Sequence, residues 1–450
     1  MSDKPKKGFL NNLKNAFEDM TDPKHYNKAI GITPFMTALK RNDLEAVEKM
    51  LKNKFDPNVY TLGGLTPLQT TVKKDLPEMA ELLIKYNADI NMPSKSTSRD
   101  TAMDIAIIFN KPRMVSLLAH HGADLERVGD DGWAALHRAA AKGRTDVIKA
   151  LLNLGAKANT PTADNRTPLS LAISWNRVDS IQTMLSYDDV IYDLNKWRSQ
   201  KSEMTFLQTS ILQGKEDIAR TMVNAGANVN TKDKNGCNAL HIAVDNGHFN
   251  LVEPLIKAGA DIGKATSKNF FITPFHILCM SEYPKDSVKE AAKIMLEYGV
   301  SPNQRTKLNE TALSLAARNP KQSDLISLLL SYNARTNVFD NLGETPLLKA
   351  IDVKNKAAIE ILIKEGKADV NLANKKTGDT PLFEAISKQD PEIVSLLLQS
   401  GAKADIKNKK DLSAIDLAKG LNNPNILSLL EKHNKPQAGI RGKTPPPPRP

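Results

Sequence analysis

Residues 130–159 read DDGWAALHRAAAKGRTDVIKALLNLGAKAN, and they show the pattern from which the fold follows. A turn leads into a short helical pattern that stops at Gly143, and a second helical pattern stops at Gly155. Glycine suits both stops because many helices end on a residue with positive φ. The second pattern carries its apolar residues on one side: Val147, Ile148, Leu151 and Leu152. One such pair of helices cannot bury its own apolar side, so it needs similar neighbours.

Similar neighbours occur along most of the chain. The signature of the first helix, which is Thr-Pro-Leu in its most regular form, starts at twelve positions: 33, 66, 101, 134, 167, 205, 238, 273, 311, 345, 380 and 413. Successive starts lie 33 to 38 residues apart. Thr is a good N-cap residue, and Pro at the first helical position lacks an N–H that would have no partner there. The pattern therefore predicts a repeated pair of helices.

The repeated signature resembles that of the ankyrin repeat over about residues 30–434. His137, His241 and His276 stand at the histidine position of that family. The resemblance implies an all-α fold, an ankyrin-repeat solenoid of paired antiparallel helices with hairpin-like turns. Each repeat of a solenoid contacts only its neighbours, so a length of 450 residues does not require several domains.

The pattern divides the chain into three segments. We expect residues 1–30 to form a basic amphipathic segment that caps the first repeat, and residues 31–434 to form about twelve repeats. Residues 435–450 have no apolar period and are predicted to be a disordered, Pro-rich, basic tail. An alternative for residues 4–20 is a helix that lies on a membrane surface, which would make the protein a membrane-surface adaptor.

Repeats five and eight are each five residues longer than the 33-residue period. The extra residues near 187–200 are predicted to lengthen the hairpin-like loop after the second helix of repeat five. Those near 280–286 are predicted to lengthen the turn between the helices of repeat eight. Insertions in repeat arrays often lie on the binding side, but surface loops also tolerate insertion at little cost. Both interpretations stay open.

Composition and charge exclude several classes of protein. The sequence has no apolar run of the roughly 20 residues that span a bilayer, and residues 1–10 lack the apolar core of a secretory signal. The formal net charge is +11, but the basic residues are spread out and form no nucleic-acid module. Cys237 and Cys279 lie in different repeats, which favours a reducing compartment. We expect a cytoplasmic monomer that binds protein, not nucleic acid, and has no transmembrane segment.

Catalytic motifs are missing from the sequence, so we expect no enzyme, cofactor or metal. His276 and Cys279 lie three residues apart, but the family histidine position and a small core residue explain them. The alternative is an enzyme with a cryptic site in the insertion of repeat five or repeat eight. A closed pocket lined by Asp188, Asp189, His276 or Cys279 would support this alternative.

The resemblance implies that partners meet the concave surface, at the turn before each signature and at the exposed end of each first helix. The residues at these places that we predict to bind a partner are Phe109, Trp133, Arg166, Trp175, Ile108, Lys73 and Lys74. Aromatic residues and Arg are typical interface anchors. A second, weaker group in repeat eight is Phe270, Ile272 and Met280. The alternative is that these side chains fold back on neighbouring repeats as additional core.

Two further signals concern modification and docking. Asn91 and Asn371 are similar to ankyrin asparagines that a eukaryotic asparaginyl hydroxylase modifies, although such residues also stabilise the turn. Residues 445–449, PPPPR, resemble part of a polyproline ligand for an SH3 or WW module.

The Lys- and Asn-rich, irregular repeats also resemble ankyrin effectors that intracellular bacteria deliver into eukaryotic cells. That resemblance implies a place of action in the host cytosol. The same composition suits an ordinary eukaryotic adaptor or a bacterial cytosolic protein.

Overall fold

The computed structural model describes residues 34–61, 63–199, 202–266 and 271–434. The predictions for residues 1–30 and 435–450, and for Thr33 and Phe270, lie outside the described residues. The chain divides into two compact units. Unit 1 comprises residues 1–197 and 224–227, and unit 2 comprises residues 198–223 and 228–450.

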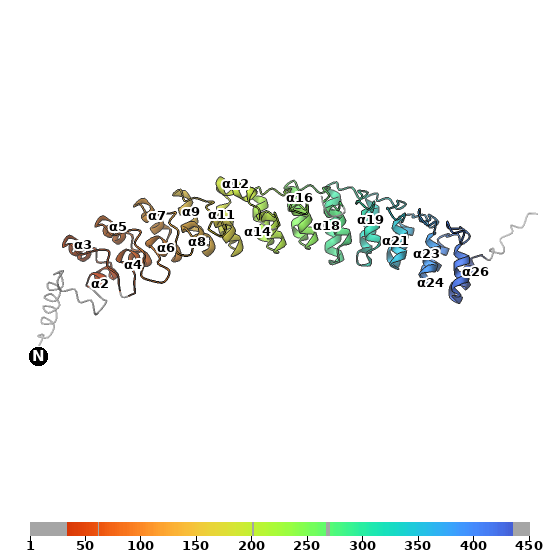
Figure 1. Cartoon of the computed structure of the whole chain (residues 1–450), viewed down its shortest axis with the longest axis horizontal. Helices are drawn as coiled ribbons and strands as arrows, with labels where there is room; N and C mark the ends of the chain where they lie inside the picture. The colour runs from red at the N-terminus through yellow and green to blue at the C-terminus, as the bar shows by residue number, and fades with distance from the viewer. Residues whose placement is uncertain (1–33, 62, 200–201, 267–270, 435–450) are drawn as a thin grey trace, which may run out of the picture. The chain divides into compact units, whose positions relative to one another are not determined.

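Unit 1 is a stack of helix pairs that follow one another in chain order (Figure 1). Its first helices are α2 (Pro34–Lys40), α4 (Pro67–Lys74), α6 (Ala102–Ile108), α8 (Ala135–Lys142) and α10 (Pro168–Ser174). Its second helices are α3 (Leu44–Lys52), α5 (Pro77–Lys85), α7 (Pro112–His120), α9 (Thr145–Asn153) and α11 (Val178–Met184). A further helix, α12 (Asp188–Lys196), ends the unit.

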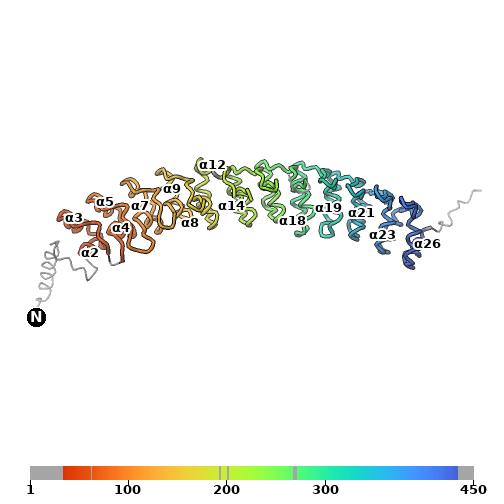
Figure 2. The backbone as a smooth tube through the Cα atoms, in the orientation of Figure 1, coloured from red at the N-terminus to blue at the C-terminus, as the bar shows by residue number. Residues whose placement is uncertain are grey.

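Unit 2 continues the same arrangement through seven pairs in its described residues (Figure 2). Its first helices are α13 (Phe206–Leu212), α15 (Ala239–Asp245), α17 (Pro274–Met280), α19 (Ala312–Ala317), α21 (Pro346–Asp352), α23 (Pro381–Ser387) and α25 (Ala414–Leu421). Its second helices are α14 (Glu216–Asn224), α16 (Val252–Lys257), α18 (Lys285–Glu297), α20 (Ser323–Ser331), α22 (Lys356–Lys364), α24 (Pro391–Gln399) and α26 (Pro424–Asn434). Short 3₁₀ turns, η2 (Phe249–Leu251) and η3 (Pro320–Gln322), precede α16 and α20. The predicted all-α solenoid is confirmed.

The signature residues start the first helices as the sequence predicts. In α4, the Thr66 hydroxyl accepts a hydrogen bond from the Gln69 N–H at 3.2 Å, and Pro67 occupies the first helical position. The first helices then pack on the first helices of adjacent repeats through small residues such as Ala106 and Ala139, both fully buried. Because alanine keeps the helices close, the larger buried residues of the second helices complete a continuous core within each unit.

The third residue of several first helices joins one repeat to the next. Gln69 donates from Nε2 to the carbonyl oxygens of Met92, at 2.8 Å, and Asp100, at 3.1 Å, in the turn of repeat three. Gln208 makes the equivalent bonds to Thr231 and Cys237. The side chain thereby satisfies buried carbonyl groups that would otherwise cost free energy on burial.

The insertion of repeat five differs from its prediction. We predicted a loop, but residues 188–196 form α12. Val190 and Leu194 are four residues apart and fully buried, and Asp188 and Asp189 occupy the N-terminal turn, where negative charge favours a helix. The helical spacing of these buried residues is present in the sequence, and the prediction of a loop is wrong.

The insertion of repeat eight also differs in part. The segment between α17 and α18 has four residues, Ser281–Pro284, against two between α4 and α5. Most of the additional length lies in α18, which has 13 residues where a typical second helix of this chain, such as α5, has nine. The insertion therefore lengthens a helix as well as the turn.

The described part of the chain contains no helix with the length and apolar composition that crossing a membrane requires. Among the same residues, no group of three His, Cys, Asp or Glu side chains is arranged to hold a metal ion.

Buried histidines predict a loss of stability in acid. Burial lowers the pKa of His241 to about 4, and it also lowers the pKa of His137 and His276. Unfolded histidine binds a proton near pH 6.5, so between pH 6.5 and 4 the unfolded chain binds more protons than the folded chain. The free energy of unfolding therefore decreases as the pH is lowered through this window. For His241 alone the decrease is about 2 kcal/mol at pH 5.

The measurement is urea unfolding at pH 7 and pH 5. His241→Gln keeps the residue type that repeats two and six use at this position, and it should reduce the loss between the two pH values. The exposed His121→Gln is the control and should leave that loss unchanged. If the free energy of unfolding decreased equally between pH 7 and pH 5 in wild type and in His241→Gln, the acid sensitivity would not come from His241.

A backbone constraint predicts a stabilising substitution. The residue two places before the signature start has positive φ in each of the eleven repeats where the structure describes it. Phe271 holds this place in repeat eight with φ of +53°, although a left-handed conformation costs a residue with a side chain about 1–2 kcal/mol. Phe271 is half exposed, so Phe271→Gly should raise the free energy of unfolding by about 1 kcal/mol.

Urea unfolding checks this prediction too. The reciprocal control is Gly132→Ala at the same place in repeat four, where φ is +77° and the surroundings leave space for a Cβ atom. Gly132→Ala should destabilise, and a stabilised Gly132→Ala would show that the backbone is free to change.

Candidate partner-binding surface

The residues predicted to bind a partner lie at opposite ends of the first helices of unit 1. Lys73, Lys74, Ile108, Phe109 and Trp175 lie at the C-terminal ends of α4, α6 and α10. Trp133 and Arg166 lie in the turns before α8 and α10. A helix of seven residues is about 10 Å long, so the structure divides the predicted set into two groups.

The eighth position from the start of each first helix forms a row that we call the helix-end row. Its members are Arg41, Lys74, Phe109, Lys142 and Trp175, one from each of the five repeats of unit 1, and all five are exposed. Phe109 is 44% exposed and Trp175 is 56% exposed. These two aromatic side chains are therefore not additional core. Packed helices lie about 8–10 Å apart, which sets the spacing of the row.

Basic side chains hold the row in place. The Nζ atom of Lys73 lies 5.3 Å from the centre of the Phe109 ring, a cation–π contact between repeats two and three. Lys74 donates from Nζ to the carbonyl oxygen of Lys40 at 3.2 Å, at the end of the preceding first helix. Lysine suits this position because the C-terminus of a helix favours positive charge.

Ile108 is less accessible than its neighbour Phe109. Its side chain is half buried, and its carbonyl oxygen accepts a hydrogen bond from Arg144 Nη2 at 2.9 Å. Ile108 therefore contributes to the packing of repeats three and four as well as to the surface.

Trp133 and Arg166, which we call the turn pair, meet across repeats four and five. The Cζ atom of Arg166 lies 5.7 Å from the centre of the indole ring. Arg166 also forms an ion pair with Asp164, with 2.5 Å between Nε and Oδ2. Its side chain is about half exposed, so the pair presents a cation stacked on an aromatic ring to solvent.

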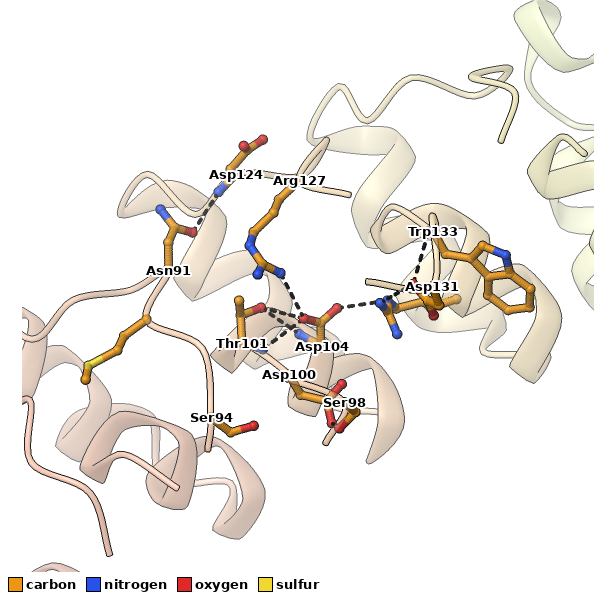
Figure 3. A network of polar contacts seen from close by, with 12 residues as sticks. Asn91, Ser94, Ser98, Asp100, Thr101, Asp104, Asp124, Arg127, Asp131 and Trp133 are labelled. Carbon is orange, nitrogen blue, oxygen red and sulfur yellow. Dashed lines mark hydrogen bonds and ion pairs between the residues drawn. The ribbon is translucent and has the colours of Figure 1, made fainter. Parts of the chain in front are cut away.

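A network of charges positions Trp133 (Figure 3). Asp131 Oδ1 accepts hydrogen bonds from the Trp133 N–H at 3.1 Å and from Arg138 Nη2 at 2.7 Å. Arg138 Nε lies 3.1 Å from Asp104 Oδ1, and Arg127 Nη1 lies 3.8 Å from Asp104 Oδ2. In Figure 3 the indole projects on the far side of Asp131 from Asp104, so the network holds the backbone of Trp133, and the partly exposed ring contacts Arg166 instead.

The network follows from the residue type at one position. Asp104 is the third residue of α6, where Gln69 and Gln208 stand in other repeats. A carboxylate has no hydrogen to donate to the carbonyl groups of the next turn, so repeat four supplies two arginines instead. Sequence reasoning missed this set, although Asp104 in the signature with Arg127 and Arg138 in the next repeat was a readable signal.

Asn91 and Asn371 both bond across repeats. Asn371 donates from Nδ2 to the Gly401 carbonyl at 3.2 Å and accepts from the Lys403 N–H at 2.8 Å. Asn91 accepts from the Asp124 N–H at 3.2 Å. The amide groups therefore stabilise the turns, and hydroxylation of these residues stays a prediction.

The four residues of the alternative catalytic site lie on two helices, α12 and α17, and the other cysteine, Cys237, lies in the turn before α15. Burial raises the pKa of Cys237 to about 11 and also raises the pKa of Cys279, so both thiols stay protonated at neutral pH. His276 is buried and hydrogen-bonded through Nε2 to the Gln304 carbonyl oxygen at 3.0 Å. Asp188 and Asp189 are exposed on α12. These groups do not form the closed pocket that a catalytic site would need.

Comparison with known proteins identifies one family. A family model described as "Ankyrin repeats (3 copies)" matches residues 7–94, 35–129, 103–196, 188–266, 321–410 and 353–439.

Two curated relatives match over part of their length. An ankyrin repeat protein of fowlpox virus is 28% identical over 262 residues, which cover 58% of this chain and 44% of the viral protein. The mouse ankyrin repeat and SOCS box protein 16 is 28% identical over 254 residues, which cover 53% of each chain. The chain thus spans about half the length of these relatives.

Among solved structures, the ankyrin repeat domain of human ASB11 is 24% identical to this chain. It covers 52% of this chain, and all of that domain is matched, with a TM-score of 0.44.

The network around Trp133 predicts a stability effect with a specific rescue. Arg138→Met leaves the Asp104 carboxylate, 9% exposed, without its nearest cation, and should lower the free energy of unfolding by about 3 kcal/mol. Adding Asp104→Gln places glutamine at the third position of the helix, as in repeats two and six, and should recover most of the lost free energy of unfolding. Urea unfolding measures both, with the exposed Arg113→Met as control. If the double variant were as unstable as Arg138→Met, the need for Arg138 would not come from the Asp104 carboxylate.

Proposed function

This chain belongs to the ankyrin-repeat family, and because ankyrin repeats are generally protein–protein interaction modules, we propose that it is a non-enzymatic scaffold whose unit 1 binds a protein partner. The proposed binding surface is the helix-end row, with the turn pair as a second contact at the other end of the first helices. The observation that supports this most is the alternation of basic and aromatic residues along the row.

The alternation runs from repeat two to repeat five, and repeat one adds a further basic residue. Repeats one, two and four place Arg41, Lys74 and Lys142 in the row, whereas repeats three and five place Phe109 and Trp175 there. Core packing does not require any of these residue types at an exposed position. Large exposed aromatic residues usually mark an interaction site, and tryptophan is among the residues most often found as an interface anchor.

The row also defines the chemistry of the partner. A partner segment with apolar side chains near Phe109 and Trp175, and with carboxylates near Lys74 and Lys142, would match it in both shape and charge. Complementary charge mainly raises the association rate and the specificity, and it is screened as salt increases. We therefore expect an acidic, partly apolar partner whose binding weakens at high salt.

The proposal places the scaffold in the cytoplasm, and in the cytosol of a host cell if the chain is a bacterial effector. Both described cysteines are free thiols, which fits a reducing compartment. The relatives from a mouse and from a poxvirus fit a role in animal cells. The docking of residues 445–449 to an SH3 or WW module and the monomeric state stay predictions.

The test is quantitative capture from eukaryotic cytosol, with wild type compared to Phe109→Ser/Trp175→Ser. Both side chains are exposed, so the variant should keep its helix content, which circular dichroism checks. The main captured protein should fall at least about tenfold, because losing two anchors of 1 to 2 kcal/mol each has at least that effect.

The matched control is Leu342→Ser/Leu412→Ser, which removes two exposed apolar side chains of unit 2, outside both the row and the turn pair. This control should capture the partner like wild type. Equal capture by wild type and the row variant would refute the proposed surface, and loss of capture in the control alone would place the binding site elsewhere.

A further inference from the structure

Unit 2 contains a cleft that neither the helix-end row nor the turn pair involves. The cleft lies along the first helices α13, α15 and α17 and has a volume of about 630 Å³. Its apolar residues include Leu212, Ile242, Ile277 and Met280. Leu212 is 48% exposed and Met280 is 38% exposed, so the cleft presents apolar surface to solvent. Methionine is suited to binding because its flexible side chain adapts to different partners.

The insertion of repeat eight forms one wall of this cleft. Tyr283 in the inserted segment donates from its hydroxyl to the Asp245 carbonyl oxygen at 3.1 Å. Its ring packs edge-on against Phe249, with 5.5 Å between ring centres. The ring also lies close to Gly247, where a Cβ atom would come within 2.6 Å of it. The preceding repeat therefore has a glycine where the tyrosine needs space.

The following repeat holds the same segment from the other side. Gln322 is buried and donates from Nε2 to the carbonyl oxygens of Ser281, at 3.2 Å, and Tyr283, at 2.9 Å. Asn319 donates from Nδ2 to the Ser281 carbonyl at 2.9 Å. A segment fixed from both neighbouring repeats is pre-organised, which lowers the entropy cost of binding. Neutral drift of a surface loop does not require such support.

The charge of the cleft is opposite to that of the chain. Its charged lining residues are Asp233, Asp245 and Glu282, all acidic, although the formal net charge of the chain is +11. Asp233 is engaged by the N–H groups of Asn235 and Cys237, whereas Asp245 and Glu282 are exposed at the rim. The hydrogen bond from Lys321 lowers the pKa of Glu282 and keeps it ionised. Lys321 itself is largely exposed, so a ligand cation can approach the same carboxylate.

We propose that this cleft binds a short basic, amphipathic segment of a partner protein. Apolar side chains of the segment pack on Leu212 and Met280, and its Lys or Arg side chains pair with Asp245 and Glu282. Unit 1 offers a basic row and unit 2 offers an acidic cleft, so the chain can hold two segments of opposite charge. This second site does not depend on the partner proposed for unit 1.

The experiment selects peptides from a phage-displayed library of random 12-residue sequences on the full-length protein. The enriched peptides should include a class that combines apolar residues with Lys or Arg, beside any acidic peptides that the helix-end row selects. A synthetic copy should bind at least tenfold more weakly to Met280→Ser and to Asp245→Lys than to wild type, measured by fluorescence anisotropy. Leu342→Ser and Asp405→Lys, which change exposed residues outside the cleft, should bind like wild type.

Other outcomes overturn the proposal. An absence of basic, partly apolar peptides among those enriched, or equal binding of such a peptide to wild type and to the cleft variants, would each exclude a basic ligand at this site. Acidic peptides that bind the cleft variants like wild type belong to the helix-end row and leave this test unchanged. Sedimentation velocity of the chain alone tests for a different occupant, since residues 4–20 of a second copy are also basic and apolar in sequence. A dimer that Met280→Ser dissociates would assign the cleft to self-association.

Discussion

The structure depends on a side chain that serves two repeats at once. In several first helices the third residue takes part in the cap of its own helix and also bonds to the turn of the next repeat. Gln69 shows both roles, because its Oε1 accepts from the Thr66 N–H while its Nε2 donates to carbonyl groups of repeat three. The same side chain therefore couples the start of its own helix to the stacking of the next repeat. Where the residue is Asp104, the next repeat must supply cations, and the Arg138 network results.

This coupling leaves the exposed positions free to vary. Contacts within each unit join adjacent repeats, so a residue in the helix-end row can change without altering the core. Unit 1 has basic and aromatic residues in that row, and unit 2 has an apolar cleft with acidic rim residues. The same repeat therefore supports two surfaces of different chemistry. The function that we propose uses such surface residues and not the residues that define the repeat.

The sequence was sufficient to predict the fold because the repeated features act locally. Thr66, Pro67 and the glycine stops act within one repeat, and their spacing gives the period. The contacts of the helix-end row were harder to foresee. The repeat pattern predicts both Phe109 and Trp133 at the surface, but only the structure shows that they lie at opposite ends of the first helices and that Trp133 is only partly exposed. Helix α12 was missed because a short amphipathic stretch in an insertion was interpreted as a loop. Tyr283 was missed because its supports, Gly247 and Gln322, come from two other repeats.

Photo-crosslinking at Lys142 would show whether a partner binds the helix-end row. Lys142 stands in the helix-end row between Phe109 and Trp175, and Lys149 is equally exposed on the second helix of the same repeat. A photoreactive amino acid at position 142, in full-length protein mixed with eukaryotic cytosol, should give a discrete crosslinked partner. The same group at position 149 should not. A partner crosslinked from position 149 and not from position 142 would contradict binding at the helix-end row.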